Sequence, residues 1–331
     1  MFAGVVDRLI PLQTWLFPSQ VLLELDDHFL TLLALHHRHR GSIPTVKWLE
    51  RVPLPAGTCE QGIPVRTEAL ADFIGDLLVE RGFTAARVAA VLPELATEWH
   101  LVQWPGPDWP EDPRRLLIER GREAGFRLPI QSADLRVMRL EPAAGATAPS
   151  SLVIAVRKAL LQGWIDTFAT AGLGFDGLEA SQVCVLRALE PFLGETPDGQ
   201  VVVVLELLKD RGHLLLVQRG IPVYERRLSG SLAGIEAIAD ELRRSVDYWR
   251  QQELGVTSVQ LVLHGSQAAL AEAVVEPLRQ LLPAWELVVA DPFALGWLAG
   301  PAEPQIAEEG AIPAGVELLR LLGLALVEAY R

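Results

Sequence analysis

The sequence predicts an α/β protein in which one structural plan is used twice. Residues 201–228 contain three short apolar segments separated by turns around Asp210 to Gly212 and at Arg219-Gly220, a pattern that predicts an antiparallel β-meander. Residues 21–35 repeat the opening of this meander, and each copy has one acid inside its first apolar segment. After residue 150, segments with strand and helix patterns alternate, which is typical of α/β proteins.

The first half is expected to begin with strands and to continue with a helix. The helix pattern covers Thr67–Arg81, where Thr67 is expected as the N-cap and Gly82 as the terminator. Its apolar stripe consists of Leu70, Phe73, Ile74, Leu77 and Leu78. The strands are predicted over Val21–Leu25, Phe29–Leu35, Thr45–Val52 and, after the helix, Arg87–Leu92.

A change of character at Pro93 predicts a small inserted subdomain. A strand over Trp99–Trp104, a helix over Pro113–Gly125 and a strand over Ser132–Leu140 are followed by a loop rich in Ala, Gly and Pro from Glu141 to Ser150. Three tryptophans, Trp99, Trp104 and Trp109, lie in this segment. A small core explains them most simply, and a partner-binding edge is the alternative.

The second half is expected to surround the meander with helices. The helices are predicted over Leu160–Ala171, Gln182–Leu189, Ser231–Gln252, Gln267–Leu282 and Val316–Tyr330. Further strands are predicted over Leu152–Val156, Phe175–Glu179, Val259–Leu263 and Glu286–Ala290. The C-terminal helix is apolar on most sides, so we expect it to be buried.

Composition narrows the class of protein. The chain has 331 residues, of which 50% are hydrophobic, so two domains or four subdomains with sizeable cores are expected. Its formal charge of −13 argues against a general nucleic-acid binder. Cys59 and Cys184 are too few for a disulfide framework or a multi-cysteine metal site, and they fit a reducing cytoplasm.

Two segments near the N-terminus could each be interpreted as a functional site. Residues 1–20 lack the form of an export signal, and their apolar residues are expected to pack on the protein's own body, with a membrane or partner as the alternative. The histidines between His36 and Gly41 alternate with arginines, so a solvated turn is favoured over a metal site. No run of about 18–20 uncharged apolar residues predicts a membrane-spanning helix.

Several fragments, in this order and spacing, carry a family resemblance. They include Pro53-Leu54-Pro55-Ala56-Gly57, Glu123-Ala124-Gly125-Phe126-Arg127-Leu128-Pro129, Ala155-Val156-Arg157-Lys158, the segment from Leu242 to Trp249, and Asp291-Pro292-Phe293. Together they resemble the PilM family, the cytoplasmic actin-like proteins of type IV pilus assembly, along nearly the whole chain. The resemblance implies an actin-like, ribonuclease-H-like duplicated fold with a small inserted α+β subdomain and a reduced fourth subdomain.

The resemblance also implies domain boundaries. An N-terminal extension would cover residues 1–20, the first subdomain 21–92, and the inserted subdomain 93–150. Residues 151–331 would form the second half, with a C-terminal helix that could return to the first subdomain.

In the family, three turns hold the nucleotide, and this chain departs from the pattern at each. The first turn, where the family has Asp followed by Gly and Ser, here has Glu24, Asp26, Asp27 and His28, whose carboxylates would repel phosphate unless a cation intervened. The resemblance therefore implies that this part of the pocket is degenerate.

The other two turns also differ from the family pattern. The second contains Glu206, Leu208 and Asp210, and the leucine replaces a glycine that lets backbone approach phosphate. At the third, a run of glycines is reduced to Gly265-Ser266. Loss at all three turns predicts that ATPase activity is absent or strongly reduced, with no cofactor and no metal.

The function implied by the resemblance is that of a non-catalytic cytoplasmic scaffold at the inner membrane. It would bind the cytoplasmic tail of a PilN-like membrane protein and connect it to the pilus motor, supporting pilus biogenesis, twitching motility or DNA uptake. The family's mode of binding implies a tail groove beside the inserted subdomain. Its expected residues are Trp99, Leu101, Trp104, Leu116 and Leu117.

Two alternatives remain open from the sequence. The chain could be an active ATPase of the actin and sugar-kinase group, with Glu24 and Glu206 holding Mg²⁺ and ATP. It could also resemble the cytoplasmic part of the type II secretion L protein, which is another partner-binding platform.

Overall fold

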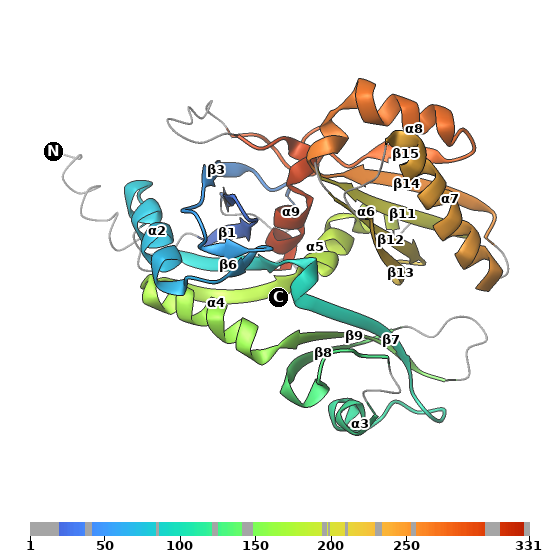
Figure 1. Cartoon of the computed structure of the whole chain (residues 1–331), viewed down its shortest axis with the longest axis horizontal. Coiled ribbons are helices and arrows are strands. Elements are labelled where there is room, and N and C mark those ends of the chain that lie inside the picture. Colours follow the sequence, from blue (N-terminus) through green and yellow to red (C-terminus); the bar gives the residue numbers. More distant parts are fainter. Residues whose placement is uncertain are drawn as a thin grey trace. The chain divides into compact units, whose positions relative to one another are not determined.

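The computed structural model describes residues 20–36, 42–83, 86–120, 125–140, 148–193, 197, 199–208, 211–228, 234–252, 256–301 and 312–327 (Figure 1). The predicted extension 1–20, apart from Gln20, and most of the histidine cluster therefore lie outside the described residues. The chain divides into two compact units, formed by residues 1–34 with 51–181 and by residues 35–50 with 182–331.

The first five-stranded sheet has the order β10-β6-β1-β2-β3. Strand β1 runs antiparallel to β2 and parallel to β6, and β6 runs parallel to β10. These strands are β1 (Gln20–Leu25), β2 (Phe29–Leu35), β3 (Val46–Pro53), β6 (Arg87–Leu92) and β10 (Gly174–Ala180). A two-stranded hairpin of β4 (Cys59–Glu60) and β5 (Ile63–Pro64) follows β3 in the chain. The strands predicted in this region are confirmed to within one or two residues.

Two helices in this unit pack against each other, α2 (Thr67–Glu80) and α4 (Lys158–Thr170). The predicted stripe of α2 is buried at four of its five positions, and Phe73 is half-buried. The predicted cap is wrong, because Thr67 is already helical and Arg66 occupies the N-cap without a side-chain hydrogen bond. The start of the helix is set instead by the Thr58 carbonyl, which accepts from the backbone N–H groups of Val65 and Arg66.

The inserted subdomain is a three-stranded antiparallel sheet of order β7-β9-β8 with one helix, α3 (Pro113–Arg120). Its strands are β7 (Thr97–Gln103), β8 (Ala133–Arg139) and β9 (Ser150–Arg157). The predicted boundary at residue 150 is wrong, because β9 is the central strand of this sheet. An apolar run such as Leu152–Val156 predicts a buried strand but does not show which sheet it joins. The next elements, α4 and β10, also belong to the first unit, which ends at Ser181.

The second unit repeats the strand order of the first. Its sheet reads β13-β12-β11-β14-β15, and the first sheet, read from its other edge, reads β3-β2-β1-β6-β10. The central strand of each sheet makes the same two pairings. Strand β1 pairs antiparallel with β2 and parallel with β6, and β11 pairs antiparallel with β12 and parallel with β14. The strands are β11 (Gln200–Leu207), β12 (Gly212–Gln218), β13 (Ile221–Leu228), β14 (Ser258–His264) and β15 (Glu286–Val289). The predicted duplication is therefore confirmed.

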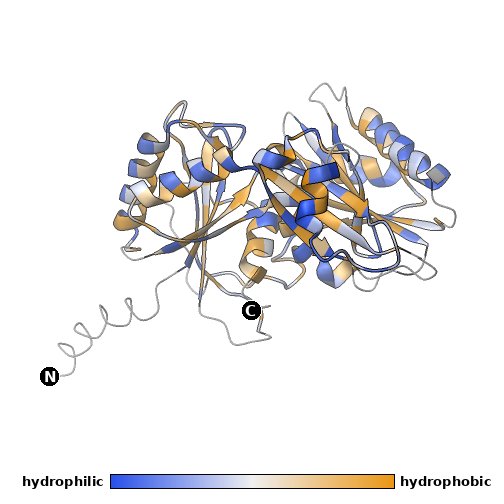
Figure 2. Ribbon diagram, turned by 90° about the horizontal axis from the view of Figure 1, so that it is seen from below, coloured by the Kyte–Doolittle hydropathy of each residue, from blue (hydrophilic) through white to orange (hydrophobic). Residues whose placement is uncertain are grey.

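The helices of the second half are α5 (Ser181–Ala188), α6 (Glu190–Leu193), α7 (Ile235–Gln252), α8 (Glu276–Leu281) and α9 (Leu319–Ala325). Only the six residues 229–234 separate β13 from α7, which leaves little chain for a fourth subdomain. Ala239, Leu242 and Val246 of α7 pack on the sheet in one apolar core. Figure 2 shows many strand residues in the colours of hydrophobic residues, whereas hydrophilic and hydrophobic residues alternate along α7.

One predicted helix differs in the structure. The segment predicted as a helix over Gln267–Leu282 forms a 3₁₀ turn (Ser266–Ala269), a π-helical turn (Ala271–Val275) and the short helix α8. Pro277 has no N–H to donate to the carbonyl four residues earlier, and its ring disfavours a regular helix before it. A continuous helix therefore cannot pass through this segment.

The C-terminal helix is buried, as predicted. In α9 the residues Leu319, Leu321, Leu322, Gly323 and Leu324 are all buried. A 3₁₀ turn over Gly315–Glu317 replaces the predicted first helical turn. Across the residues described in the structure, no helix has both the length and the apolar character needed to cross a bilayer.

Candidate functional site

The turn between β1 and β2 satisfies its own backbone. The Asp26 carboxylate accepts hydrogen bonds from the backbone N–H groups of His28 and Phe29, each at 2.7 Å. The Asp26 N–H in turn donates to the Phe29 carbonyl at 3.0 Å. Turn amides of this kind bind phosphate when they are free. Here a carboxylate of the chain occupies two of them.

Neighbouring loops hold this turn in place. The Asp27 carboxylate accepts from the Gly62 N–H at 3.2 Å, and the His28 carbonyl accepts from the Leu54 N–H at 2.7 Å. Gly62 has a φ of +73°, and a Cβ atom there would lie 2.7 Å from the Leu25 carbonyl oxygen. The turn is therefore built from side chain and backbone groups that fit one another closely.

The potential around this turn is negative. Burial raises the pKa of the Cys59 thiol to about 12; a hydrogen bond with Thr58 opposes the rise, and the Asp27 and Asp26 carboxylates add to it. Glu24 lies half-buried in β1 opposite Thr31 of β2. A phosphate brought to this turn would meet several carboxylates, as the sequence predicts.

At the second turn, Glu206 is neutralised by the chain itself. It lies near the end of β11 and is 4% exposed. The Arg320 guanidinium, from α9, donates a hydrogen bond to Glu206 Oε2. A buried carboxylate needs such a partner, and a protein cation serves this need as a bound Mg²⁺ would.

Two histidines surround this ion pair. Glu206 lies opposite His213 of β12 and beside His264 of β14 in the strand registers. Burial lowers the pKa of His264 well below its ordinary value, and the charges of Arg320 and His213 lower it further. His264 is therefore a neutral imidazole at neutral pH.

A second, partly buried contact joins His213 of β12 to Glu225 of the neighbouring strand β13. His213 Nε2 is 2.5 Å from Glu225 Oε1, and the Gln182 amide donates to the same oxygen at 3.2 Å. Burial would raise the pKa of Glu225, but the hydrogen bonds from His213 and Gln182 and the charges of His213 and Arg227 lower it overall. The carboxylate is thus held in its charged form.

The third turn packs closely on the second. Gly265 has a φ of +92°, and a Cβ atom there would lie 2.6 Å from the Leu207 carbonyl oxygen. Its N–H donates to the Val316 carbonyl at 2.9 Å, so this amide too is used within the chain. Ser266, the next residue, begins the 3₁₀ turn. In the second turn, the Leu208 N–H donates to the Arg211 carbonyl, and Asp210 lies outside the described residues.

The predicted pocket residues thus form two groups. Glu206 and Gly265 come together in the second unit, and Asp26, Asp27 and His28 belong to one turn of the first unit. Arg320 is not among the site residues that the sequence predicts. The sequence does contain a sign of its role, because Arg320 is the one charged residue between Leu318 and Leu326 and a buried charge needs a partner.

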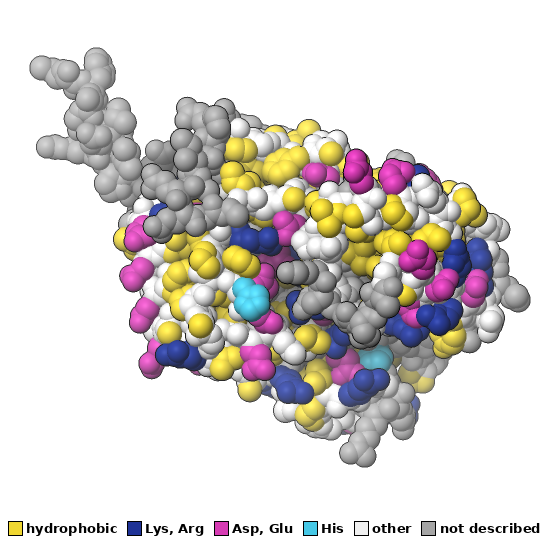
Figure 3. All heavy atoms as spheres, turned by 45° about the horizontal axis from the view of Figure 1, so that its top comes forward, with side chains coloured by type: hydrophobic (Ala, Val, Ile, Leu, Met, Phe, Trp, Pro, Cys, Tyr) yellow, Lys and Arg dark blue, Asp and Glu magenta, His cyan; other side chains and the backbone are white. Residues whose placement is uncertain are grey.

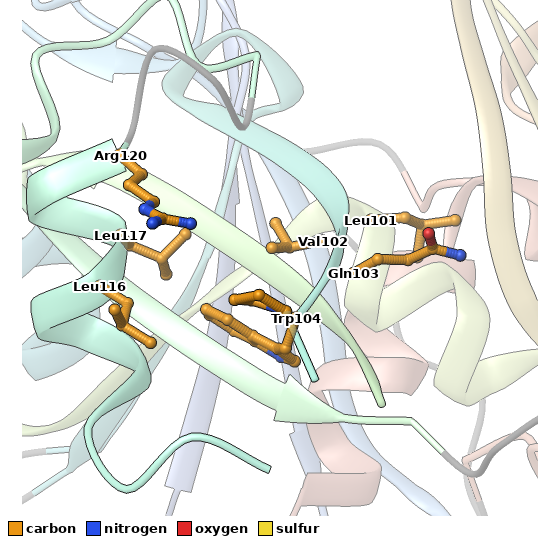
Figure 4. A pocket seen from close by; sticks show the side chains of 8 residues that line it. Leu101, Val102, Gln103, Trp104, Leu116, Leu117 and Arg120 are labelled. Atoms are coloured by element: carbon orange, nitrogen blue, oxygen red, sulfur yellow. The ribbon is translucent and has the colours of Figure 1, made fainter. Parts of the chain in front are cut away.

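The inserted subdomain carries a cavity of about 230 Å³ between β7 and α3 (Figure 4). It is lined by Leu101, Val102, Gln103, Trp104, Pro105, Leu116, Leu117 and Arg120. Trp104 and Leu117 are almost fully buried, and the Trp104 indole donates to the Ser151 hydroxyl at 2.6 Å. Four of the five predicted partner-binding residues line the cavity, whereas Trp99 does not.

The surface charges are mixed on the face drawn in Figure 3. Acidic and basic side chains alternate there with apolar ones, and the described residues on this face form no continuous basic surface. Charges along α7 are also paired: Arg243 pairs with Asp240 at 2.7 Å and Arg250 with Asp247 at 3.4 Å.

Comparison with known proteins agrees with the duplicated strand order. Neither a protein-family model nor a curated protein sequence matches the chain. Among solved structures, the chain is similar to a chain of a PilM–PilN type IV pilus biogenesis complex, with 24% identity, a TM-score of 0.72, and coverage of 94% of this chain and 98% of that one. The chain has an actin-like fold.

Weaker similarities were found to other proteins. The cytoplasmic domain of EpsL, an inner membrane component of the type II secretion system of Vibrio cholerae, is 12% identical with a TM-score of 0.45, covering 93% of this chain and 95% of that one. The ethanolamine utilization protein EutJ of Carboxydothermus hydrogenoformans is 15% identical, also with a TM-score of 0.45, covering 93% of this chain and 89% of that one. Neither similarity bears on the function of this actin-like chain.

Proposed function

We propose that this chain is a cytoplasmic platform of the PilM type, which binds the tail of a PilN-like inner-membrane protein and supports type IV pilus assembly without hydrolysing ATP. The observation that carries the proposal is the cavity between β7 and α3, in a chain that shares its fold with a PilM–PilN complex over 94% of its length. The protein would be peripheral at the inner membrane and held there by its partner. Motility or DNA uptake would then depend on it.

The shape and chemistry of the cavity support peptide binding. Its floor is formed by Trp104 and Leu117, which are 4% and 2% exposed, and Leu116 lies half-buried at its wall. Buried aromatic and aliphatic groups of this kind supply most of the affinity in protein–peptide interfaces.

The three turns support the absence of catalysis. The backbone amides that would face a nucleotide are bonded to Asp26 in one turn and to the Val316 carbonyl in another. Glu206 is paired with Arg320, so Mg²⁺ would have to displace a buried guanidinium before it could bind there. These contacts disfavour the alternative in which Glu24 and Glu206 hold Mg·ATP.

The decisive experiment is a titration of the purified chain with a synthetic peptide of the cytoplasmic tail of the PilN-like protein from the same organism. We expect saturable binding by isothermal titration calorimetry. Leu116→Asp, which puts a charge into the cavity wall, should weaken binding about tenfold or more.

Ile118→Asp provides the matched control. Ile118 is on the same helix and is 45% exposed, and it does not line the cavity. This variant should bind the tail like the wild type. No binding by the wild-type chain, or equal losses in the two variants, would contradict the proposed function.

A further inference from the structure

Strand β7 is an edge of the small sheet and turns part of its backbone outward. The order β7-β9-β8 leaves one side of β7 unpaired by any strand in the described part of the chain. The Trp104 N–H donates to the Pro149 carbonyl at 2.9 Å, so the backbone of Trp104 faces β9. Because backbone groups alternate along an antiparallel strand, Val102 also faces β9, whereas Leu101 and Gln103 direct their N–H and C=O groups outward.

The cavity lies along this edge. It is lined by the consecutive residues 101–105 together with α3. Figure 4 shows the side chains of Val102 and Trp104 toward α3, and those of Leu101 and Gln103 on the other side of the strand. Successive side chains of a strand point to opposite faces, and the residues that line the cavity include Leu101 and Gln103 as well as Val102 and Trp104. The outward backbone groups and the apolar cavity are therefore adjacent.

Two other sheet edges in the described part of the protein carry features that discourage pairing, and β7 lacks them. Edge strand β13 contains Pro222, and edge strand β10 is interrupted by a bulge between Phe175 and Gly177. Proline and bulges are common protections of exposed edges. The sequence of β7, Thr-Glu-Trp-His-Leu-Val-Gln, has no proline and no lysine.

The helix beside the cavity is basic in an acidic protein. It carries Arg114, Arg115 and Arg120 against Glu119 alone, whereas the whole chain has a formal charge of −13. Arg115 pairs with Glu119 at 3.0 Å. Arg120 is exposed, lines the cavity and forms no ion pair with another described residue. The cavity therefore presents one available cation beside an apolar floor.

We propose that an extended acidic peptide adds to β7 as a fourth strand of the small sheet. Its backbone pairs with the outward N–H and C=O groups of Leu101 and Gln103. Its apolar side chains, at alternate positions, enter the cavity over Trp104 and Leu117, and a carboxylate of the peptide meets Arg120. The source of the peptide rests on the proposed function, since the membrane partner's tail is the expected occupant.

The first test uses a probe that does not depend on that source. A phage-displayed library of random dodecapeptides is selected on the full-length chain, and enriched peptides are synthesised. We expect sequences with apolar residues at alternate positions and an Asp or Glu. Failure to enrich any peptide, or enrichment of peptides that lack these features, would overturn the inference.

The second test is the exchange of backbone amide hydrogens, residue by residue, with and without an enriched peptide. Strand addition should slow exchange at Leu101 and Gln103 about tenfold or more, because their N–H groups become hydrogen-bonded. Val102 already faces β9, so its exchange should change far less. Equal protection along the strand would indicate packing without strand addition and would contradict the inference.

Variants separate backbone from side chain. Leu101→Pro removes an outward N–H but no hydrogen bond to β9, so the fold should survive and binding should weaken about tenfold. Leu101→Ala keeps the N–H and should retain binding within about threefold. Equal losses in these two variants would overturn the strand-addition model, and the exchange data decide the question if Leu101→Pro does not fold.

The charge is tested on the same helix. Arg120→Glu should weaken binding of the enriched peptides about tenfold, whereas Arg114→Glu, outside the cavity, should not. The membrane tail peptide is titrated in parallel. If enriched peptides add to β7 while the tail does not bind, the proposed function fails and this inference stands. If the tail binds and its affinity is unchanged by Leu101→Pro and by Arg120→Glu, the proposed function stands and this inference fails.

Discussion

At Glu206 the protein supplies its own counter-charge. The side chains of Glu206 and Arg320 are 6% and 14% exposed, and their ion pair joins β11 to α9. A buried pair of this kind adds little when both partners are present, but removal of one partner leaves an uncompensated charge. The pair therefore makes the fold independent of a cation at this position.

This dependence on Arg320 can be measured. Arg320→Met keeps an apolar stem and leaves Glu206 buried without this cation, so we expect the free energy of unfolding to fall by about 3–5 kcal/mol. Urea unfolding followed by circular dichroism measures the change. The double variant Arg320→Met/Glu206→Leu should recover most of the loss.

An exposed ion pair provides the control. Arg279 and Glu276 are 49% and 52% exposed, so Arg279→Met should change the free energy of unfolding by less than about 1 kcal/mol. If Arg320→Met cost no more than this control, the account of the buried pair would be wrong.

His264 makes stability depend on pH. Its pKa is lowered by burial and by Arg320 and His213, so the folded protein holds it neutral. The unfolded chain binds a proton there below about pH 6.5. Stability from this residue is therefore complete above about pH 6.5 and falls as the pH decreases toward the folded pKa, by up to about 1.4 kcal/mol per pH unit.

The prediction concerns the slope of stability against pH. Urea unfolding between about pH 7 and pH 5 gives the slope of the free energy of unfolding against pH. In His264→Gln this slope should be flatter than in the wild type, by an amount that corresponds to the uptake of up to one proton. A wild-type slope in His264→Gln would exclude this residue as the source. Glu225, whose pKa is lowered in the folded protein, also contributes stability that is lost at low pH. That loss begins only when the pH falls below the pKa of the unfolded side chain, about 4.3.

Among the elements, α9 is held by close contact with α5. A Cβ atom at Gly323 would overlap the backbone carbonyl of Cys184, and the Arg187 guanidinium donates to the Gly323 carbonyl at 2.8 Å. Backbone atoms cannot move aside as a flexible side chain can. The glycine therefore permits a helix contact that no other residue could make.

Two helical glycines test this contact. Gly323→Ala should lower the free energy of unfolding by about 2–3 kcal/mol or more through overpacking. Gly163→Ala, in α4, meets no atom within 4 Å and should raise it by about 0.5–1 kcal/mol, because alanine favours a helix. Urea unfolding reports both values. Equal effects would show that α9 does not pack closely on α5.

For the whole molecule, the same strand order occurs in both large sheets, and groups of the chain close the turns at which the sequence analysis placed a nucleotide pocket. The first turn is closed by Asp26, the second by Arg320, and the third by the contact of Gly265 with Leu207 and Val316. If the proposed function is right, each closure uses groups that a nucleotide or its metal ion would engage in an active relative. We therefore expect the native state to form completely without ATP.

Thermal unfolding tests this expectation. Millimolar Mg·ATP or Mg·ADP should leave the midpoint at its value in the same concentration of magnesium alone. A ligand at about 100 times its dissociation constant would stabilise the native state by roughly 2.7 kcal/mol, which is readily detected. A clear upward shift would revive the ATPase alternative and make Glu24→Gln and Glu206→Gln the next variants.

Much of this architecture follows from local sequence. Short apolar runs ending in Gly turns predicted β11, β12 and β13, and the spacing of Leu242 and Val246 predicted α7. These signals arise from the two periods of side-chain exposure and from backbone preferences, so they can be recognised without a structure. The resemblance to the PilM family then predicted the actin-like fold, and four of the five residues that it implied for partner binding line the cavity.

By itself the sequence determined the order of strands and helices, the duplicated plan, and the unusual residues at the three turns. Only the tertiary structure decided that β9 completes the small sheet, that Arg320 reaches Glu206, and that the β7 backbone faces outward beside the cavity. Propensity and periodicity are properties of neighbouring residues. Strand pairing, ion pairs between residues 114 positions apart and sheet edges arise only when distant segments pack together.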